Sequence, residues 1–343
     1  MRQTPALENF ESVPALKDGF GRSIDYLRIS VTDRCDLRCQ YCMAEKMTFL
    51  PRKDVLTLEE IALLADHFIA RGIRKIRLTG GEPLVRRDLP DLAHRIGRHL
   101  GKGRFEELTL TTNGTRLAEH AEALARAGIS RINVSLDSLD PATYTRLTRG
   151  GDISKVLAGL KAAQASGIAI KINMVALRGI NEREFTSMLQ WCADQGHDLT
   201  LIETMPLGSI EEDRTERYLP LSHAVEAISR HHVLTPVQHK TGGPARYHAV
   251  EGLGIKLGLI TPLSNNFCAG CNRMRLTCEG KMFMCLGRDA HVDFRAALRE
   301  GDANTIDKAF NQALAGKPLA HDFAIDAKHT APAVARHMSV TGG

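Results

Sequence analysis

The sequence predicts an α/β protein: a partial (β/α)6 TIM-like barrel with a smaller C-terminal α+β domain closing its open side. Three observations support this prediction. Six short β-rich runs alternate with longer amphipathic stretches, the alternation ends soon after residue 206, and shorter strand and helix patterns follow. Strands that alternate with helices favour a parallel sheet. Eight such units complete a barrel, so six predict an open one.

Each predicted strand is short and rich in apolar or β-branched residues. In chain order the runs are Asp25–Val31, Lys75–Thr79, Leu108–Thr112, Arg131–Leu136, Ile168–Val175 and Leu199–Met205. Leu58–Ile69 and Leu117–Ala127 have the apolar spacing of helices, and Thr57 followed by Glu60 has the pattern of a capping box.

The pattern changes in the last third of the chain. Helices are expected over Leu221–His231, Val292–Arg299 and Thr305–Leu314, and strands over Arg246–Val250 and Ile255–Ile260. We therefore predict an N-terminal extension over residues 1–18, the barrel over 19–235 and a C-terminal domain over 236–343.

Composition excludes several classes of protein. Hydrophobic residues make up 43% and charged residues 25% of the 343 residues, which argues against disorder. The net charge of +5 and the 5% aromatic content argue against bulk nucleic-acid binding. No apolar stretch reaches membrane-span length, and no secretory pattern opens the sequence, so we expect a cytoplasmic protein that binds no membrane.

Seven of the eight cysteines fall into two clusters, and Cys192 stands alone. Clustered cysteines in a reducing compartment indicate metal sites. Cys35, Cys39 and Cys42 form C-x3-C-x2-C, and three thiolates leave one iron of a four-iron cluster open to another ligand. A structural zinc site with a distant fourth ligand, such as His67, is the alternative, although this spacing is unusual for zinc.

The second cluster, Cys268, Cys271 and Cys285, has the spacing C-x2-C-x13-C. Cys278 could complete a four-cysteine zinc site, and spacing alone does not separate zinc from iron–sulfur. Arg273 and Arg275 alternate along the chain, so they can point to one side of an extended segment. Such a cationic pair beside a metal site suits an anionic ligand.

The first motif resembles that of the radical S-adenosylmethionine (SAM) superfamily. Tyr41 supplies the aromatic residue before the third cysteine, and Gly80-Gly81-Glu82-Pro83 resembles the superfamily's second signature. The resemblance implies a [4Fe–4S] cluster held by three cysteines, with the open iron bound to SAM. It also implies cleavage of SAM to methionine and a 5′-deoxyadenosyl radical.

From Arg28 to the last residue, the chain resembles the GTP 3′,8-cyclase family more specifically. The marks of this resemblance are C-x2-C-N-R-x-R-x9-C, from Cys268 to Cys285, and the terminal Gly342-Gly343. It implies conversion of GTP to (8S)-3′,8-cyclo-7,8-dihydroguanosine 5′-triphosphate, an early step of molybdenum cofactor biosynthesis. The radical would abstract H3′ of GTP, and C3′ would then bond to C8.

The same resemblance implies a role for each matching position. The cysteines that would hold two [4Fe–4S] clusters, three to each, are Cys35, Cys39 and Cys42, then Cys268, Cys271 and Cys285, with Cys278 left to packing. SAM would be bound by Tyr41, Gly81, Ser135 and Met205. GTP would be bound by Arg28, Arg77, Thr111, Lys171, Arg273, Met274 and Arg275, and Gly342 and Gly343 would reach the catalytic site.

The family also implies partners: a reductant such as flavodoxin or ferredoxin, and the downstream cyclic pyranopterin monophosphate synthase. The sequence does not decide whether the protein forms a homodimer. Two other functions remain alternatives at this point. One is a radical SAM peptide-modifying maturase with an auxiliary cluster, and the other is a non-enzymatic iron–sulfur or zinc sensor.

Overall fold

In a computed structural model that describes residues 15–301 and 303–342, twelve strands form one sheet, with the order β12-β11-β10-β1-β2-β3-β4-β5-β6-β9-β8-β7. The central six are parallel and follow chain order. They are β1 (Tyr26–Ser30), β2 (Lys75–Thr79), β3 (Glu107–Thr112), β4 (Arg131–Ser135), β5 (Ala169–Ala176) and β6 (Asp198–Glu203). The predicted (β/α)6 partial barrel is confirmed.

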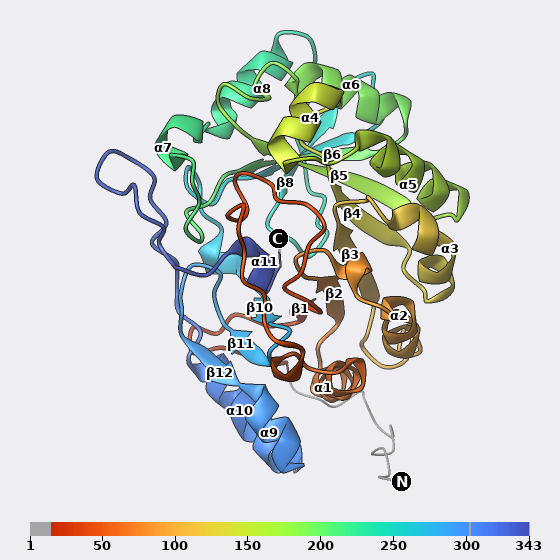
Figure 1. The fold of residues 1–343 in the computed structure, drawn as a ribbon, viewed down its shortest axis with the longest axis vertical. Helices are drawn as coiled ribbons and strands as arrows, with labels where there is room; N and C mark the ends of the chain where they lie inside the picture. Colours follow the sequence, from red (N-terminus) through yellow and green to blue (C-terminus); the bar gives the residue numbers. More distant parts are fainter. Residues whose placement is uncertain (1–14, 302, 343) are drawn as a thin grey trace.

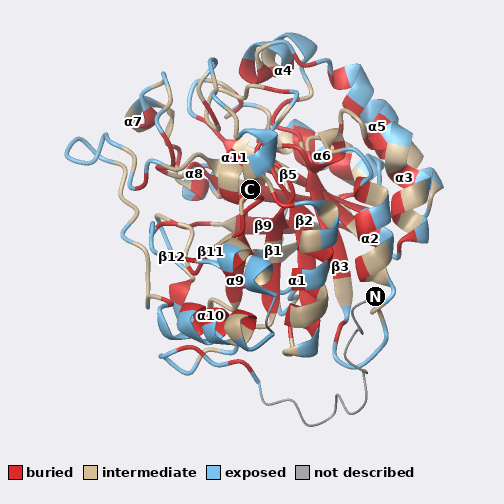
Figure 2. Ribbon diagram, turned by 60° about the horizontal axis from the view of Figure 1, so that its bottom comes forward, coloured by how far each residue is buried: buried red, intermediate tan, exposed pale blue. Residues whose placement is uncertain are grey.

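Helices cover the outer side of the central strands (Figure 1). They are α1 (Leu58–Ala70), α2 (Leu89–Gly97), α3 (Leu117–Arg126), α4 (Pro141–Thr148), α5 (Ile153–Ala165) and α6 (Phe185–Asp194). The hydrophobic core lies between these helices and the strands, which are buried along most of their length (Figure 2). The predicted capping box is present, since the Thr57 hydroxyl accepts from Glu60 N and the Glu60 carboxylate accepts from Thr57 N.

The C-terminal part extends both edges of the sheet. At one edge, β9 (Lys256–Ile260) pairs in parallel with β6 and continues to β8 (Arg246–Val250) and β7 (Leu234–Val237). At the other, β10 (Arg273–Leu276) pairs in parallel with β1 and continues to β11 (Lys281–Phe283) and β12 (His291–Asp293). The division into domains at residue 235 stays a prediction, because strands from before and after this residue belong to the same sheet.

The remaining helices are α7 (Arg214–Arg217), α8 (Leu221–Ser229), α9 (Phe294–Glu300), α10 (Ala303–Ala315) and α11 (Met338–Thr341), with 3-10 turns at Arg52–Asp54, Pro83–Val85 and Cys268–Gly270. The expected start of a helix at Val292 is wrong by two residues. Residues 291–293 form β12 instead, and the Asp293 side chain caps α9 by accepting from Arg295 N and Ala296 N.

The last described residues lie inside the barrel. Figure 1 shows α11 at the centre of the strand ring, and α11 contacts β1. Thr341 is buried, and Gly342 lies at the carboxyl end of β2. In the part of the chain that the structure describes, no helix is long and apolar enough to cross a bilayer.

Candidate active site

One cavity inside the strand ring gathers residues that are far apart in the sequence. Its lining comes from the central strands, from β10, from the loop over residues 241–245 and from the C-terminal segment. The predicted site residues that it brings together are Arg28, Arg77, Lys171, Met205, Cys268, Cys271, Arg273, Arg275, Cys285 and Gly342. Five of the seven residues predicted to bind GTP therefore share one chamber with the second cysteine cluster, while Thr111 and Met274 do not line it.

Strand register explains why the cationic side chains converge. Arg28 on β1 is paired with Arg275 on β10 on one side and with Arg77 on β2 on the other. Residues paired across neighbouring strands point to the same face of a sheet. Three guanidinium groups therefore form one row across three adjacent strands, and Lys171 on β5 contributes an ammonium group to the same cavity.

Three of the arginines that line the cavity each have a buried donor without a partner, whereas Arg77 Nε donates to Thr109 Oγ1 at 3.2 Å. The Nε atoms of Arg28, Arg273 and Arg275 are buried without a hydrogen-bond partner, as is the Thr111 hydroxyl. Burial lowers the pKa of Arg28 strongly, and repulsion from Arg275, Arg77 and Arg273 adds to the effect although Tyr26 opposes it. Buried cationic groups with unpartnered N–H donors are costly, so this arrangement favours an anionic ligand.

The second set of cysteines lies beside these cations. Cys268 is buried, and Cys271 and Cys285 are half-buried; all three line the cavity. Burial alone would raise the pKa of Cys271, but the charges of Arg273 and Lys317 outweigh it and lower the pKa to about 6. A thiolate is the form that binds metal, so the surroundings prepare Cys271 as a ligand.

Cys278 is not among the residues that line this cavity. It is fully buried, and burial together with the nearby Asp33 carboxylate raises its pKa to about 12. Its backbone carbonyl accepts a hydrogen bond of 2.7 Å from Leu56 N, which joins β10–β11 to the segment before α1. These contacts support a packing role for Cys278.

The first set of cysteines follows the carboxyl end of β1, and three other segments contact it. Asn113 Nδ2, after β3, lies 3.8 Å from Cys35 Sγ. The backbone N–H of Ser339, in the C-terminal segment, donates to the Cys42 thiol. Burial, with the nearby Asp137 carboxylate, raises the pKa of Cys42 to about 12.

Tyr41 is fixed by a carboxylate after β4. Its hydroxyl donates to Asp137 Oδ2 at 2.7 Å, and Asp137 Oδ1 accepts from Val175 N at 2.8 Å. Burial raises the pKa of Asp137 to about 6 even though both hydrogen bonds oppose the shift. Asp137 thus orients the aromatic ring that stands between the second and third cysteines.

The Gly80-Gly81-Glu82-Pro83 segment packs directly against the start of the first cysteine loop. A Cβ on Gly81 would lie 2.7 Å from Asp33 O, so only glycine permits this approach. The buried Glu82 carboxylate accepts from Leu84 N at 2.9 Å, Thr112 Oγ1 at 2.7 Å and Asn113 N at 2.6 Å. Glu82 therefore ties the loops after β2 and β3 together around the cysteines.

Relatives of known function resemble the whole chain. The Radical SAM superfamily profile matches residues 29–192, and the Molybdenum Cofactor Synthesis C profile matches residues 197–323. A GTP 3′,8-cyclase of Erythrobacter litoralis is 57% identical over 329 residues, covering 96% of this chain and 98% of the relative. Those of Rhizobium etli and Brucella canis are 56% and 52% identical, with 95% and 100% of this chain covered and 94% and 100% of the relatives.

This chain belongs to the GTP 3′,8-cyclase family. It therefore belongs to the radical SAM enzymes, which use a [4Fe–4S] cluster and SAM. Among solved structures, Streptococcus suis SuiB bound to S-adenosylmethionine aligns with a TM-score of 0.57 at 15% identity, covering 92% of this chain and 77% of that one. SuiB bound to its precursor peptide SuiA aligns with a TM-score of 0.55 at 16% identity, covering 78% and 61%. At this identity the likeness shows the fold alone.

Some residues predicted from the cyclase family lie outside the cavity. Met274 alternates with the two arginines on β10, and its side chain is fully buried in the hydrophobic core. Ser135 ends β4 and pairs with Asn173 within β5, while Tyr41 and Gly81 lie in the loops after β1 and β2. Gly343 lies outside the described residues.

The sequence patterns did not single out several neighbours of the cavity. Tyr247 accepts a hydrogen bond of 3.0 Å from Lys171 Nζ, and Asn133 lies beside Lys171 in register. The Gly242–Pro244 turn belongs to the loop that lines the cavity next to Lys75. These residues carry no motif, because their position depends on how distant strands pair.

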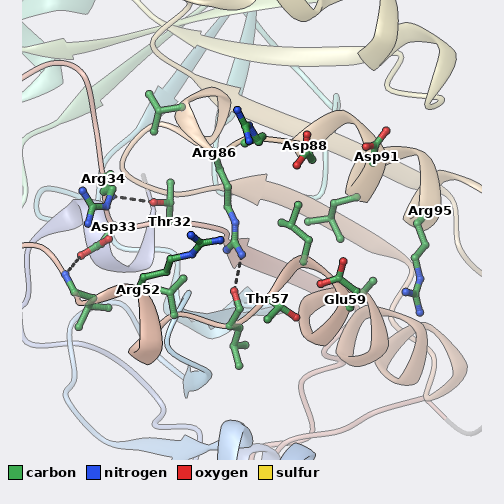
Figure 3. A pocket seen from close by; sticks show the side chains of 18 residues that line it. Thr32, Asp33, Arg34, Arg52, Thr57, Glu59, Arg86, Asp88, Asp91 and Arg95 are labelled. Carbon is green, nitrogen blue, oxygen red and sulfur yellow. Dashed lines mark hydrogen bonds between the residues drawn. The ribbon is translucent and has the colours of Figure 1, made fainter.

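A second hollow, of about 810 Å³, lies between the first cysteine segment and the amino ends of α1 and α2 (Figure 3). Arg86 extends across it and donates to the carbonyls of Val31 and Leu56. Five arginines and four carboxylates line the hollow, so its charge is nearly balanced and favours no particular ion. Arg86 acts here as a tie between the end of β1 and the segment before α1.

We expect Glu203→Ala to destabilise the protein by about 1–3 kcal/mol, because buried donors would lose their acceptor. Glu203 is fully buried at the end of β6, and its carboxylate accepts from Leu263 N and Ser264 N at 3.1 Å. Urea unfolding would measure the change, with the exposed Glu226→Ala as the control. Equal stability of the two variants would contradict a structural role for Glu203.

Proposed function

We propose that the cavity inside the strand ring holds SAM and GTP between two [4Fe–4S] clusters. The chain is a radical SAM enzyme of the GTP 3′,8-cyclase type, which forms (8S)-3′,8-cyclo-7,8-dihydroguanosine 5′-triphosphate for molybdenum cofactor biosynthesis. The first cluster with SAM would supply the 5′-deoxyadenosyl radical chemistry that removes H3′ of GTP and lets C3′ bond to C8, and the radical left on the base would take up one electron and one proton. The protein holds the reacting atoms together and excludes water.

One observation carries this proposal: three arginines with unpartnered buried Nε atoms and three cysteines line the same cavity. A nucleoside triphosphate carries about four negative charges, and Arg28, Arg77, Lys171, Arg273 and Arg275 supply positive charge to meet them. Cys268, Cys271 and Cys285, which line the same cavity, would hold the second cluster beside the substrate. The donor set thus fits the substrate of the family.

The match to the cyclase family also assigns roles to the residues around the first cluster. Cys35, Cys39 and Cys42 would hold the first cluster, and Tyr41, Gly81, Ser135 and Met205 would contact SAM. Gly81 lets the loop after β2 approach the backbone of Asp33 and Arg34 closely, and Tyr41 is held in place by Asp137. Thr111 and the backbone of Met274 would add polar contacts to GTP, and Gly342 and Gly343 would complete the catalytic site.

The wider setting of the enzyme is also part of the proposal. We expect cytoplasmic location, electron supply by a flavodoxin or ferredoxin, and use of the product by cyclic pyranopterin monophosphate synthase. A homodimer would be compatible with the fold. The absence of a spanning helix among the described residues does not oppose these expectations.

The metal content of anaerobically prepared protein tests the two-cluster proposal. We expect about eight irons and eight sulfides per chain, falling to about four of each when Cys268, Cys271 and Cys285 are changed to Ala. Changing Cys278 to Ala serves as the matched control and should leave about eight irons. Zinc in place of the second four irons would contradict the proposal and give the C-terminal cysteines a structural role.

A further inference from the structure

Lys317 is a buried lysine beside the second set of cysteines. It follows α10, and only 3% of its surface is exposed. Its Nζ donates to Met284 O at 2.7 Å and to Arg273 O at 2.8 Å, and lies 3.5 Å from Cys271 Sγ. An ammonium group has three protons, so these three acceptors satisfy it completely.

The acceptors belong to the segments that carry two of the cysteines. Met284 directly precedes Cys285, and Arg273 follows Cys271 at the start of β10. One ammonium group therefore fixes the backbone on both sides of the second cluster's proposed position. A lysine ammonium group is costly to bury, and its three acceptors offset that cost.

A second cation, Arg22, holds the segment of Cys268, the remaining cysteine of this set, in a different way. Arg22 donates to Cys268 O and Leu319 O at 2.8 Å and to Pro318 O at 2.7 Å, while Asp18 accepts from its Nε at 2.6 Å. Arg22 thus joins the Cys268 segment to the turn that carries Lys317. Its hydrogen bonds reach the cysteine segment only through backbone carbonyls, whereas Lys317 also reaches a thiol.

This difference separates two effects on a bound cluster. Reduction adds negative charge to a cluster and its thiolates, and a nearby cation stabilises the reduced form. Hydrogen bonds to the cluster's sulfur ligands tune its reduction potential. Lys317 supplies both a buried charge and an N–H···S contact, while Arg22 supplies backbone positioning.

We propose that Lys317 is a positioning residue that aligns Cys271 and Cys285 around the second cluster and raises that cluster's reduction potential. The inference rests on the proposed second cluster. Cys271 receives a contact from Arg273 Nη2 at 3.9 Å as well, but that guanidinium faces the substrate cavity and has an unpartnered Nε. Lys317 instead makes all its hydrogen bonds within the cysteine segments.

The test uses the full chain with Cys35, Cys39 and Cys42 changed to Ala, so that any cluster signal belongs to the second site. Lys317→Met, Lys317→Gln and Lys317→Arg are compared in this background by iron content and by redox titration followed by electron paramagnetic resonance. We expect Lys317→Met and Lys317→Gln to lower the reduced-to-oxidised ratio at fixed potential about tenfold, equivalent to about 59 mV for one electron. Lys317→Arg keeps the charge and should restore most of the potential.

Two further variants separate a specific effect from general damage. Lys308→Met removes an exposed lysine from α10 and should change nothing. Arg22→Gln should reduce the iron content with a smaller change in potential, because Arg22 makes no hydrogen bond to a thiol. Lys317→Gln is the second test of charge if Lys317→Met binds too little iron for titration, since the amide can still donate to the carbonyls.

The outcomes distinguish this inference from the proposed function. If the background protein with Lys317 intact binds no iron, the second cluster itself is wrong. If it binds about four irons and the potential of Lys317→Gln equals that of the background protein, the second cluster stands and the role of Lys317 is overturned. A lowered potential restored by Lys317→Arg supports the inference.

Discussion

Replacing Gly342 by Ala is expected to lower turnover at least about a hundredfold while both cysteine sites still bind iron. Gly342 has a φ of +73°, and an added Cβ would lie 2.8 Å from Thr79 Cβ and closer still to both branches of that side chain. Thr79 ends β2 and is itself buried, so it cannot move aside cheaply. The chain end would shift within the cavity that it lines, and displacements of about 1 Å at a reacting centre can cost this much.

Product formation and iron content would be measured on the same preparations. Gly19→Ala is the matched control, because its Cβ would meet nothing nearer than 3.7 Å and the position has no positive φ. Deleting Gly342 and Gly343 should also abolish turnover and leave the iron content unchanged. Full activity in either Gly342 variant would show that the chain end has no part in catalysis.

The repeating part of the fold could be predicted from the sequence because its signals are local. Alternation of β-rich and amphipathic runs located all six central strands, and Thr57 with Glu60 marked the start of α1. The capping box depends on residues three positions apart, which the sequence shows directly. The start of α9 was placed two residues too early, since a short strand and an Asp293 cap compete for the same residues.

The assembly of the site depended on pairing that no local pattern contains. The parallel pairing of β10 with β1 joins residues 247 positions apart in the sequence, and it alone puts Arg275 beside Arg28. The segment Met338–Thr341 has no periodicity that predicts a buried helix inside the barrel. Lys317 and Arg22 stand in no motif, so only the folded chain reveals that they hold the second cysteine set.

Arg275→Met is expected to weaken GTP binding about a hundredfold, or about 2.7 kcal/mol, and to stabilise the substrate-free protein. Arg275 is 7% exposed, its Nε has no partner, and burial with repulsion from Arg273 lowers its pKa to about 10. An apolar side chain of similar length removes this cost, and replacing buried charged groups in this way can add about 1–4 kcal/mol of stability. Functional sites commonly lower the stability of the protein when their ligand is absent.

Calorimetric titration with GTP and thermal unfolding without it measure the two halves of this prediction. Arg230→Met, which removes an exposed arginine paired with Glu226 on α8, should change neither quantity appreciably. Arg275→Lys keeps the charge but loses the planar fork that matches phosphate, so its GTP affinity should lie between those of the other two proteins. The prediction would be contradicted if the Arg275→Met variant bound GTP normally and unfolded more easily than the original protein. Arg275 would then stabilise the sheet, and the row of arginines across β10, β1 and β2 would not be the triphosphate site.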